Sequence, residues 1–415
     1  MQTLDQTVVK HHGKRALERC QSLAGISEMD GAILRQYLTP EHKRCNQLVA
    51  IWMAEAGMDT WQDEVGNQWG RLASDNPDAK RLVIGSHLDT VPNAGAFDGI
   101  LGVLLAIELA DIAHQQGINL PFHLDIVGFC DEEGTRFATT LIGSKALAGN
   151  FDPSWLDLTD ANGVSMSEAL TAFGLSPKDV GNATLTKDGV LGYLEVHIEQ
   201  GPVLEAADQA LGVVSAIAGA KRAVIEFIGQ SDHAGTTPMD MRKDTIVAAA
   251  ELTIAIEQIA KQCQHNEVAT VGYINAKPGV ANVISGYSAV SLDARAQSDD
   301  DLELLLYKIS RTAKAIASER QLELNWQWTH EAETVACDTK FQQQLLAACH
   351  ANGEDSPVLP SGAGHDAMAI APICPVGMLF IRSPGGISHH PAETVIPEDV
   401  EKALAVMYSA ISSID

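Results

Sequence analysis

Imidazoles and carboxylates recur in five short motifs that lie far apart in this sequence. The motifs are Gly85–Thr90, Phe97–Gly99, Asp131–Gly134, His197–Gln200 and Ser388–Pro391. Nitrogen and oxygen ligands of these kinds bind zinc and related divalent metals. Two such ions about 3.5–4 Å apart can share a hydroxide and stabilise the oxyanion that forms after its attack. The motifs therefore predict a metal-dependent hydrolase, and they leave open which bond is cut.

The residues of the first two motifs, Gly85–Thr90 and Phe97–Gly99, can also be interpreted as purely structural, without a metal ion. His87 would bind a metal while Asp89 holds its imidazole from behind and fixes its tautomer, but a hydrogen-bonded structural pair is the alternative. Asp98 precedes a helical pattern, so it would either cap that helix or bridge two ions with its two oxygens. Capping and bridging do not exclude each other.

The remaining motifs are equally ambiguous one by one. Adjacent side chains of an extended backbone diverge, so Glu133 is assigned to metal and Glu132 to general base and acid, with a solvated acidic turn as the alternative. His197 shares a strand face with two glutamates, which is costly unless the groups are paired or coordinated. His389 lies in a glycine-rich loop and is either a surface imidazole or the last ligand. Together the motifs favour the metal site.

Composition narrows the class of protein. A chain of 415 residues exceeds one ordinary core, so two domains are expected. The net charge of −26 argues against nucleic acid and an anionic membrane surface as partners. Seven scattered cysteines without a C-x-x-C pair fit a reducing compartment. Because the sequence offers neither a membrane-length apolar run nor a signal-peptide core, we expect a cytoplasmic protein.

The first metal motifs lie in a strand–helix–strand pattern. Leu82–Ile84 and Leu124–Phe129 are short apolar runs typical of buried strands, and Gly99–Gln116 has helical periodicity. This order predicts an α/β layer, with the motifs just past the carboxyl ends of its strands. Open α/β sheets bind their ligands at that position.

Residues 214–329 differ from the rest. Their predicted order is β-α-β-β-α-β, typical of a ferredoxin-like module. The elements are Ala223–Ile228, Lys243–Gln262, Val268–Ala276, Tyr287–Ala294, Asp299–Glu319 and Leu322–Thr329. Because glycine-rich, metal-like motifs return at 361–391, the module is predicted to be inserted. The expected domains are 1–213, 214–329 and 330–415, the first and third forming one catalytic domain.

Seven segments of the sequence resemble those of a known protein family. The matching segments are Gly85–Pro92, Phe97–Gly99, Asp131–Phe137, His197–Pro202, Asp232–Met239, Ser361–Ala367 and Ser388–Glu393. They resemble the hydantoinase/carbamoylase family of metal-dependent amidohydrolases, which includes N-carbamoyl-L-amino-acid hydrolases, allantoate amidohydrolases and β-ureidopropionases. The resemblance spans nearly the whole chain.

The resemblance implies a fold and a site. It implies an α/β, di-metal aminopeptidase-like catalytic domain with an inserted lid and dimerisation domain, and a homodimer formed through the insert. Two divalent ions are expected per subunit, zinc first, with manganese, cobalt or nickel as alternatives. By matching position, the metal ligands would be His87, Asp98 (bridging), Glu133, His197 and His389, with Glu132 as base. The substrate contacts would be Gln200, Arg222, His233, Asn282, Arg295 and Gly364.

Three of these contacts also have a reading from the residues alone. Arg295 ends an alternating strand and would grip a carboxylate in bidentate fashion, with a surface salt bridge to a nearby aspartate as the alternative. Asn282 follows a turn and would orient the ureido or carboxylate group, although Asn needs no function there. His233 would stabilise the oxyanion after lid closure or from a partner subunit.

The predicted activity is hydrolysis of a linear amide or ureido C–N bond, which releases ammonia and CO2 from a small ureido acid. Allantoate is the first choice of substrate. N-carbamoyl-L-amino acids and the β-ureidopropionase substrate are the alternatives. A di-metal dipeptidase or aminoacylase is a more distant rival, and a non-catalytic scaffold is disfavoured because every expected ligand and the base are present.

Overall fold

In the computed structural model, which describes residues 3–414, the chain divides into two units. Unit 1 comprises the residues up to Ser215, Cys337–Leu359 and the residues from Gly364 on; unit 2 comprises Ala216–Ala336 and Pro360–Ala363. The predicted boundary at residue 329 falls inside strand β11 (Glu323–Ala332), so the division lies a few residues further along the chain.

The larger sheet, mostly in unit 1, has a parallel centre. Its strand order is β1-β2-β4-β3-β5-β14-β6-β12, with β13 paired to β6. The strands are β1 (Asp59–Gln62), β2 (Gln68–Leu72), β3 (Arg81–His87), β4 (His123–Phe129), β5 (Val190–Ile198), β6 (Leu211–Ile217), β12 (Val335–Ala336), β13 (Val358–Ser361) and β14 (Val376–Ile381). Because β4, β3, β5 and β14 run parallel, their carboxyl ends meet at one edge.

Unit 1 also contains helices, and several of them contact strands of the larger sheet. The helices of unit 1 are α1 (Gln6–Ala24), α2 (Pro40–Glu55), α3 (Ile100–Gln115), α4 (Ile142–Leu147), α5 (Met166–Phe173), α6 (Val203–Ala206), α9 (Thr339–Ala351), α10 (Asp366–Ile370) and α11 (Pro397–Ile411). Of these, α2, α3, α9, α10 and α11 contact the sheet. Thr39 caps α2 by accepting from the His42 N–H, with Pro40 at the first helical position. Helix α3 is apolar on nearly every side and is buried along almost its whole length, since it contacts β3, β4 and β5 as well as α1 and α11.

Alternation along β5 separates a core face from a polar face. Leu194, Val196 and Ile198 belong to the same apolar core as α3. Glu195 and His197 lie between them in the sequence and so point to the opposite face of the sheet. The buried face fixes the register of the strand, and the register in turn fixes where His197 points.

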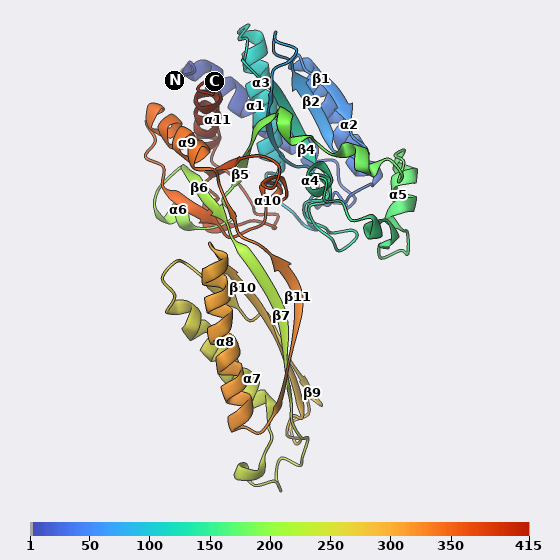
Figure 1. Ribbon diagram of the computed structural model, residues 1–415, viewed down its shortest axis with the longest axis vertical. Coiled ribbons are helices and arrows are strands. Elements are labelled where there is room, and N and C mark those ends of the chain that lie inside the picture. Colours follow the sequence, from blue (N-terminus) through green and yellow to red (C-terminus); the bar gives the residue numbers. More distant parts are fainter. Residues whose placement is uncertain (1–2, 415) are drawn as a thin grey trace. The chain divides into compact units, whose positions relative to one another are not determined.

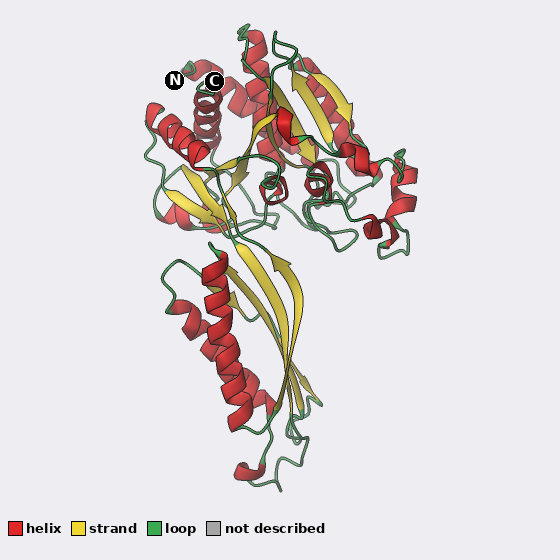
Figure 2. Ribbon diagram, viewed as in Figure 1, coloured by secondary structure: helices red, strands yellow, loops and turns green. Residues whose placement is uncertain are grey.

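Unit 2 has the element order β-α-β-β-α-β, with the second strand divided into two pieces. The elements are β7 (Gly219–Ile228), α7 (Thr245–Lys261), β8 (Val268–Thr270), β9 (Ile274–Lys277), β10 (Tyr287–Ala296), α8 (Asp299–Glu319) and β11. The sheet order is β11-β7-β10-β8, with β9 also paired to β10, and all pairs are antiparallel. Helices α7 and α8 lie on one face of this sheet (Figures 1 and 2), where they form an apolar core with β7 and β10.

The single strand predicted for Val268–Ala276 is wrong. It breaks between β8 and β9, where the backbone N–H groups of Gly272 and Tyr273 donate to Ser291 Oγ instead of continuing the ladder. A side chain that satisfies two backbone donors lets the edge of the sheet open at this point. Among residues 3–414, no helix has the length and apolar character needed to cross a membrane.

Candidate metal centre

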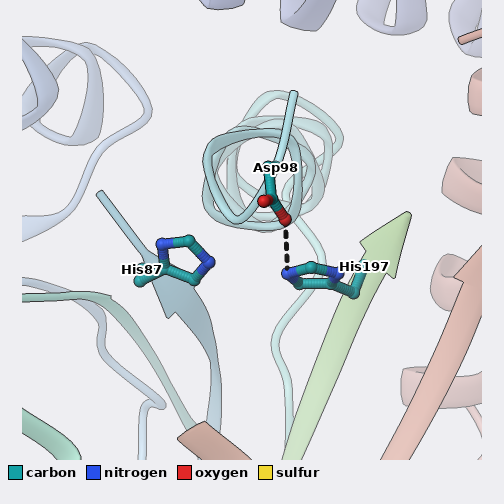
Figure 3. A group of neighbouring side chains, drawn as sticks. All are labelled: His87, Asp98 and His197. Atoms are coloured by element: carbon teal, nitrogen blue, oxygen red, sulfur yellow. Dashed lines mark ion pairs between the residues drawn. The ribbon is translucent and has the colours of Figure 1, made fainter. Parts of the chain in front are cut away.

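The parallel strands bring three of the predicted ligands to one edge of the sheet. His87 is the last residue of β3, His197 lies near the end of β5, and Asp98 immediately precedes α3 and its N-cap, Gly99 (Figure 3). All three side chains are buried, and each offers a ligand atom within 4.8 Å of the others. Asp98 Oδ1 lies 3.3 Å from His197 Nε2.

The alternative reading of Asp98 as a helix cap is wrong. Gly99 occupies the N-cap position of α3, and no side chain caps the helix. Gly99 has φ +71°, and a Cβ there would lie 2.4 Å from the His87 ring, so both conformation and close approach require glycine. Glycine at this position leaves the Asp98 carboxylate free to face the imidazoles.

Hydrogen bonds fix the orientation of both buried imidazoles. Nδ1 of His87 lies 3.1 Å from the Asp89 backbone oxygen, and Nδ1 of His197 lies 2.9 Å from the Ile198 oxygen. Carbonyl oxygens only accept, so each Nδ1 carries the proton and each neutral ring has a lone pair on Nε2. His197 Nε2 is buried without a hydrogen-bond partner and faces a carboxylate. Two acceptors at such a distance fit a cation between them.

The second oxygen of Asp98 faces a second group of ligands. His389 Nε2 lies 3.1 Å from Asp98 Oδ2 and 3.3 Å from Glu133 Oε1. Hydrogen bonds to Asp98 and Glu133 raise the pKa of the His389 imidazole to about 10. The pKa of Asp98 is lowered, because the hydrogen bond from His389 outweighs the effect of burial. This group also brings its ligand atoms within 4.8 Å of one another, which fits a second cation next to the first.

Asp89 acts on this site differently from the prediction. The Asp89 backbone oxygen holds His87, whereas its carboxylate oxygen lies 3.6 Å from that imidazole. The carboxylate instead accepts from the backbone N–H groups of Glu132 and Glu133, at 3.0 and 3.1 Å. Asp89 therefore positions the loop that carries the two glutamates, next to a left-handed Asp131 with φ +54°.

Glu132 has the environment of a group that exchanges a proton. Burial raises its pKa well above the ordinary value, and the charges of Glu133 and Asp366 add to the effect. Its carboxylate belongs to a group with His87 and Glu133 whose ligand atoms lie within 4.8 Å of one another. A Cβ on Gly364 would approach Glu132 Oε1 to 4.0 Å, so the glycine leaves open space beside the carboxylate.

Gln200 lies against the candidate ligands. Its Nε2 donates to both oxygens of Asp98, at 3.0 and 3.2 Å, and its backbone N–H donates to Ser383 Oγ. The residue has φ +57°, a left-handed conformation that is rare outside glycine and asparagine. No residue pattern in the sequence indicated this conformation.

Arg222 and Arg295 line a groove of about 690 Å³ on the sheet of unit 2. Both guanidinium groups donate to Asp293, Arg222 through Nε at 2.8 Å and Arg295 through Nε and Nη2 at 2.9 and 3.0 Å. Arg295 Nη1 also donates to the Gly362 oxygen at 2.6 Å. The salt bridge considered as an alternative for Arg295 is therefore present, and two guanidinium groups share one carboxylate, which leaves the groove with a net positive charge.

His233 and Asn282 lie on adjacent loops of unit 2. The Ala234 N–H donates to the Asn282 backbone oxygen, and His233 pairs with Val283 in an isolated bridge. The Nδ1 atom of the exposed His233 accepts from the Gly235 N–H at 3.1 Å, so its Nε2 carries the proton in the neutral ring.

Other buried polar residues around the site were not assigned a role from the sequence. Glu195 accepts from Ser86 Oγ at 2.9 Å and from the Ala367 N–H, and the rings of His365 and His197 lie 4.5 Å apart. Glu393 accepts from the backbone beside Asp98. His365 lies in Ser361–Ala367, one of the segments that resemble the family, but nothing in the sequence indicated which ring it would contact.

Comparisons with known proteins agree with this geometry. The model of peptidase family M20/M25/M40 matches residues 83–413. An N-carbamoyl-L-amino acid amidohydrolase of Geobacillus stearothermophilus is 38% identical over 96% of this chain and 98% of its own. An allantoate deiminase of Arabidopsis thaliana is 38% identical over 94% of this chain and 81% of its own. A crystal structure of a hydantoinase/carbamoylase family amidase from Burkholderia multivorans covers 96% of this chain and 97% of its own, with 32% identity and a TM-score of 0.90.

The chain therefore belongs to peptidase family M20/M25/M40, a family of metal-dependent hydrolases, and within it to the hydantoinase/carbamoylase amidohydrolases. The family predicted from the motifs is confirmed. The prediction of an enzyme that acts on C–N bonds other than peptide bonds is confirmed as well.

Proposed function

We propose that this protein hydrolyses the C–N bond of a small ureido acid with two divalent metal ions held around Asp98. The observation that carries the proposal is the placement of that carboxylate. One of its oxygens faces His197 Nε2 at 3.3 Å, and the other faces His389 Nε2 at 3.1 Å. A carboxylate with an imidazole on each side has the donor set of a bridging ligand.

His87 and His197 would complete one ion's ligands, and Glu133 and His389 the other's. Zinc suits this set of nitrogen and oxygen donors, and manganese, cobalt and nickel are alternatives. When bound, such a pair of ions lowers the pKa of water and polarises the carbonyl to be attacked.

Glu132 is the proposed general base and acid. It takes a proton from the attacking water and returns it to the leaving nitrogen as the C–N bond breaks. Burial, which raises its pKa, suits a group that must both accept and donate a proton near neutral pH. Asp89 holds the loop of Glu132 through the backbone, so we propose a positioning role for it.

The charge of the groove in unit 2 supports an acidic substrate. Arg295 and Arg222 present two guanidinium groups against one aspartate, so a substrate carboxylate would be attracted there. Gln200, His233, Asn282 and Gly364 are the further contacts proposed.

We propose allantoate as the substrate and N-carbamoyl-L-amino acids as the second candidate, because relatives named for both activities match this chain at 38% identity. A carbamoyl substrate would release carbamate, and thus CO2 and ammonia. Allantoate would give ureidoglycine with the same two products, and a second water that replaces the amine of ureidoglycine would give ureidoglycolate and a second ammonia.

We further propose that unit 2 is a ferredoxin-like lid and that it forms the interface of a homodimer. Its element order and antiparallel sheet support the first part. In that arrangement His233 would stabilise the oxyanion by hydrogen bonding, either after closure or in the partner's site.

A substrate panel tests the proposal. Ammonia release is measured with allantoate, N-carbamoyl-L-methionine and N-carbamoyl-β-alanine, each with zinc or manganese, and with a dipeptide set as control. The expected result is the highest kcat/KM for allantoate and none for dipeptides. Hydrolysis of dipeptides alone, or no hydrolysis of any ureido acid, would overturn it.

A further inference from the structure

Glu393 connects two segments that carry candidate metal ligands. It is only 6% exposed. Its Oε1 accepts from the backbone N–H groups of Phe97 and Asp98, at 3.0 and 3.1 Å, and its Oε2 accepts from Ser388 Oγ at 3.1 Å. One carboxylate thus binds the backbone of the bridging residue and the side chain that precedes His389.

The surroundings of Glu393 are shaped to admit this carboxylate. A Cβ on Gly95 would lie 2.2 Å from Glu393 Oε1, so only glycine allows the approach. At Gly99, the residue after Asp98, the absent Cβ makes room for His87. Glycine on each side of Asp98 in the sequence therefore lets this segment contact both Glu393 and His87.

The Ser388 hydroxyl links Glu393 to the candidate ligand itself. Ser388 Oγ lies 3.1 Å from Glu393 Oε2 and 3.3 Å from Asp98 Oδ2, and it has one proton to donate. When Glu393 accepts that proton, the Ser388 hydroxyl does not occupy a lone pair of Asp98 Oδ2, which stays available to a cation.

His389 depends on this arrangement more than the other candidate ligands do. Its side chain is 49% exposed, and its backbone has φ +54°. A non-glycine residue in that conformation needs its surroundings to hold it. The turn is closed by the Glu393 N–H, which donates to the His390 oxygen at 2.9 Å, and by the bond from Ser388 to Glu393.

We propose that Glu393 is a positioning residue that holds Asp98 and the His389 turn in the geometry required by the second metal ion, an inference that rests on the proposed function. It acts through hydrogen bonds behind the ligands and does not contact the ion. Residues of this kind typically change metal affinity about 10–100-fold when they are replaced.

The test is metal binding by Glu393→Gln, measured on the metal-free protein by titration with Zn²⁺ and with Mn²⁺. The amide keeps the size of the side chain but presents a donor to Ser388, which turns the hydroxyl proton toward Asp98. We expect the weaker of two binding events to weaken about 10–100-fold and the tighter event to change much less. Activity should fall at low metal concentration and recover at high metal concentration.

Two further variants sharpen the test. Gly95→Ala displaces the Glu393 carboxylate and should reproduce the weaker binding of the second ion. Glu398→Gln makes the same chemical change at an exposed position five residues away and should bind both ions normally. If Glu393→Gln binds both ions within twofold of wild type, the inference is wrong.

If circular dichroism shows that Glu393→Gln does not fold, metal binding by Ser388→Ala tests the inference instead, because this change removes only the shared hydroxyl. Weaker binding of the second ion supports the inference, and unchanged binding overturns it. Failure of the proposed function looks different, because wild type itself would then bind no ion pair or hydrolyse no ureido acid.

Discussion

Two buried clusters in unit 1 combine histidine with carboxylates, and they differ in what balances their charge. Between α1 and α3, His12 Nδ1 lies 2.6 Å from Glu108, and Asp111 completes a group that resembles a metal site. Arg15 and Arg19 donate to the same Glu108 carboxylate, at 2.9 and 2.8 Å. In this cluster, arginine side chains therefore balance the charge of the buried carboxylate.

The cluster around Asp98 has no such cations. Between residues 3 and 414, no lysine or arginine forms an ion pair with Asp98 or Glu133, and the nitrogen groups that face these carboxylates are imidazoles. Buried carboxylates without counterions are costly. The same residue types thus make a structural network where arginine is present and a candidate metal centre where it is absent.

The largest expected effect is on catalysis. Replacement of Glu132 by Gln removes the proton acceptor but none of the proposed ligands, so kcat should fall about 10²–10⁴-fold. Metal content measured by mass spectrometry should stay near that of wild type. A variant with wild-type kcat would remove Glu132 from its role.

Glu108→Gln should affect stability rather than metal. The change leaves Arg15 and Arg19 without their shared buried carboxylate, and breaking a buried ion pair costs about 3–5 kcal/mol of unfolding free energy. Urea unfolding measures the loss, and metal stoichiometry should stay unchanged. Glu18→Gln is the control, since it breaks only an exposed pair with Lys14 on the same helix. Loss of metal in Glu108→Gln would contradict the distinction between the clusters.

Removal of metal should destabilise the wild type. A single ion present at 100 times its Kd adds about 2.7 kcal/mol to the free energy of unfolding. Addition of a chelator should therefore lower Tm in differential scanning calorimetry. Asp98→Asn, which lacks the bridging carboxylate, should show a Tm that the chelator hardly changes. Equal responses of the two proteins would argue against ions at Asp98.

The smallest effect concerns a histidine that is buried without any charged partner. Burial lowers the pKa of His42 to about 3, and its Nδ1 accepts from the Leu38 N–H. The unfolded chain takes up a proton near pH 6.5 and the folded chain does not, so stability is full above that pH and falls below it. At pH 5 the loss is about 2 kcal/mol.

His42→Asn tests this pH dependence. The Asn oxygen can accept the same backbone hydrogen bond without titrating. The difference in stability between wild type and variant should therefore change with pH between about 6.5 and 5, as measured by urea unfolding. A difference that stays constant over that range would contradict the lowered pKa.

The candidate ligand motifs could be predicted from the sequence because they follow apolar strands, and parallel strands end at a common edge of a sheet. Strand patterns placed His87 and His197 at or near strand ends, and the structure shows that these strands, β3 and β5, are adjacent and parallel. Local conformation was harder to predict. Asp98 reads as a cap by residue type, but the close approach of the His87 ring requires glycine at the cap.

Contacts between distant segments could not be read from the sequence. Glu393 bonds to the Phe97 N–H across 296 positions, and no periodicity indicates such a pairing. Asp89 was predicted to act through its carboxylate because that atom is the usual partner of imidazole, yet its backbone oxygen holds His87. The break between β8 and β9 depends on Ser291, which lies on a neighbouring strand.

The position of the last ligand has a consequence for how the protein matures during translation. Gln200 and His389 lie 189 residues apart, with unit 2 between them in the chain. At about 5–20 residues per second, a ribosome needs roughly 10–40 s to cover that distance. A nascent chain thus exposes four of its five candidate ligands well before the fifth exists, so the proposed pair of metal ions can be bound in full only after the C-terminal segment has emerged.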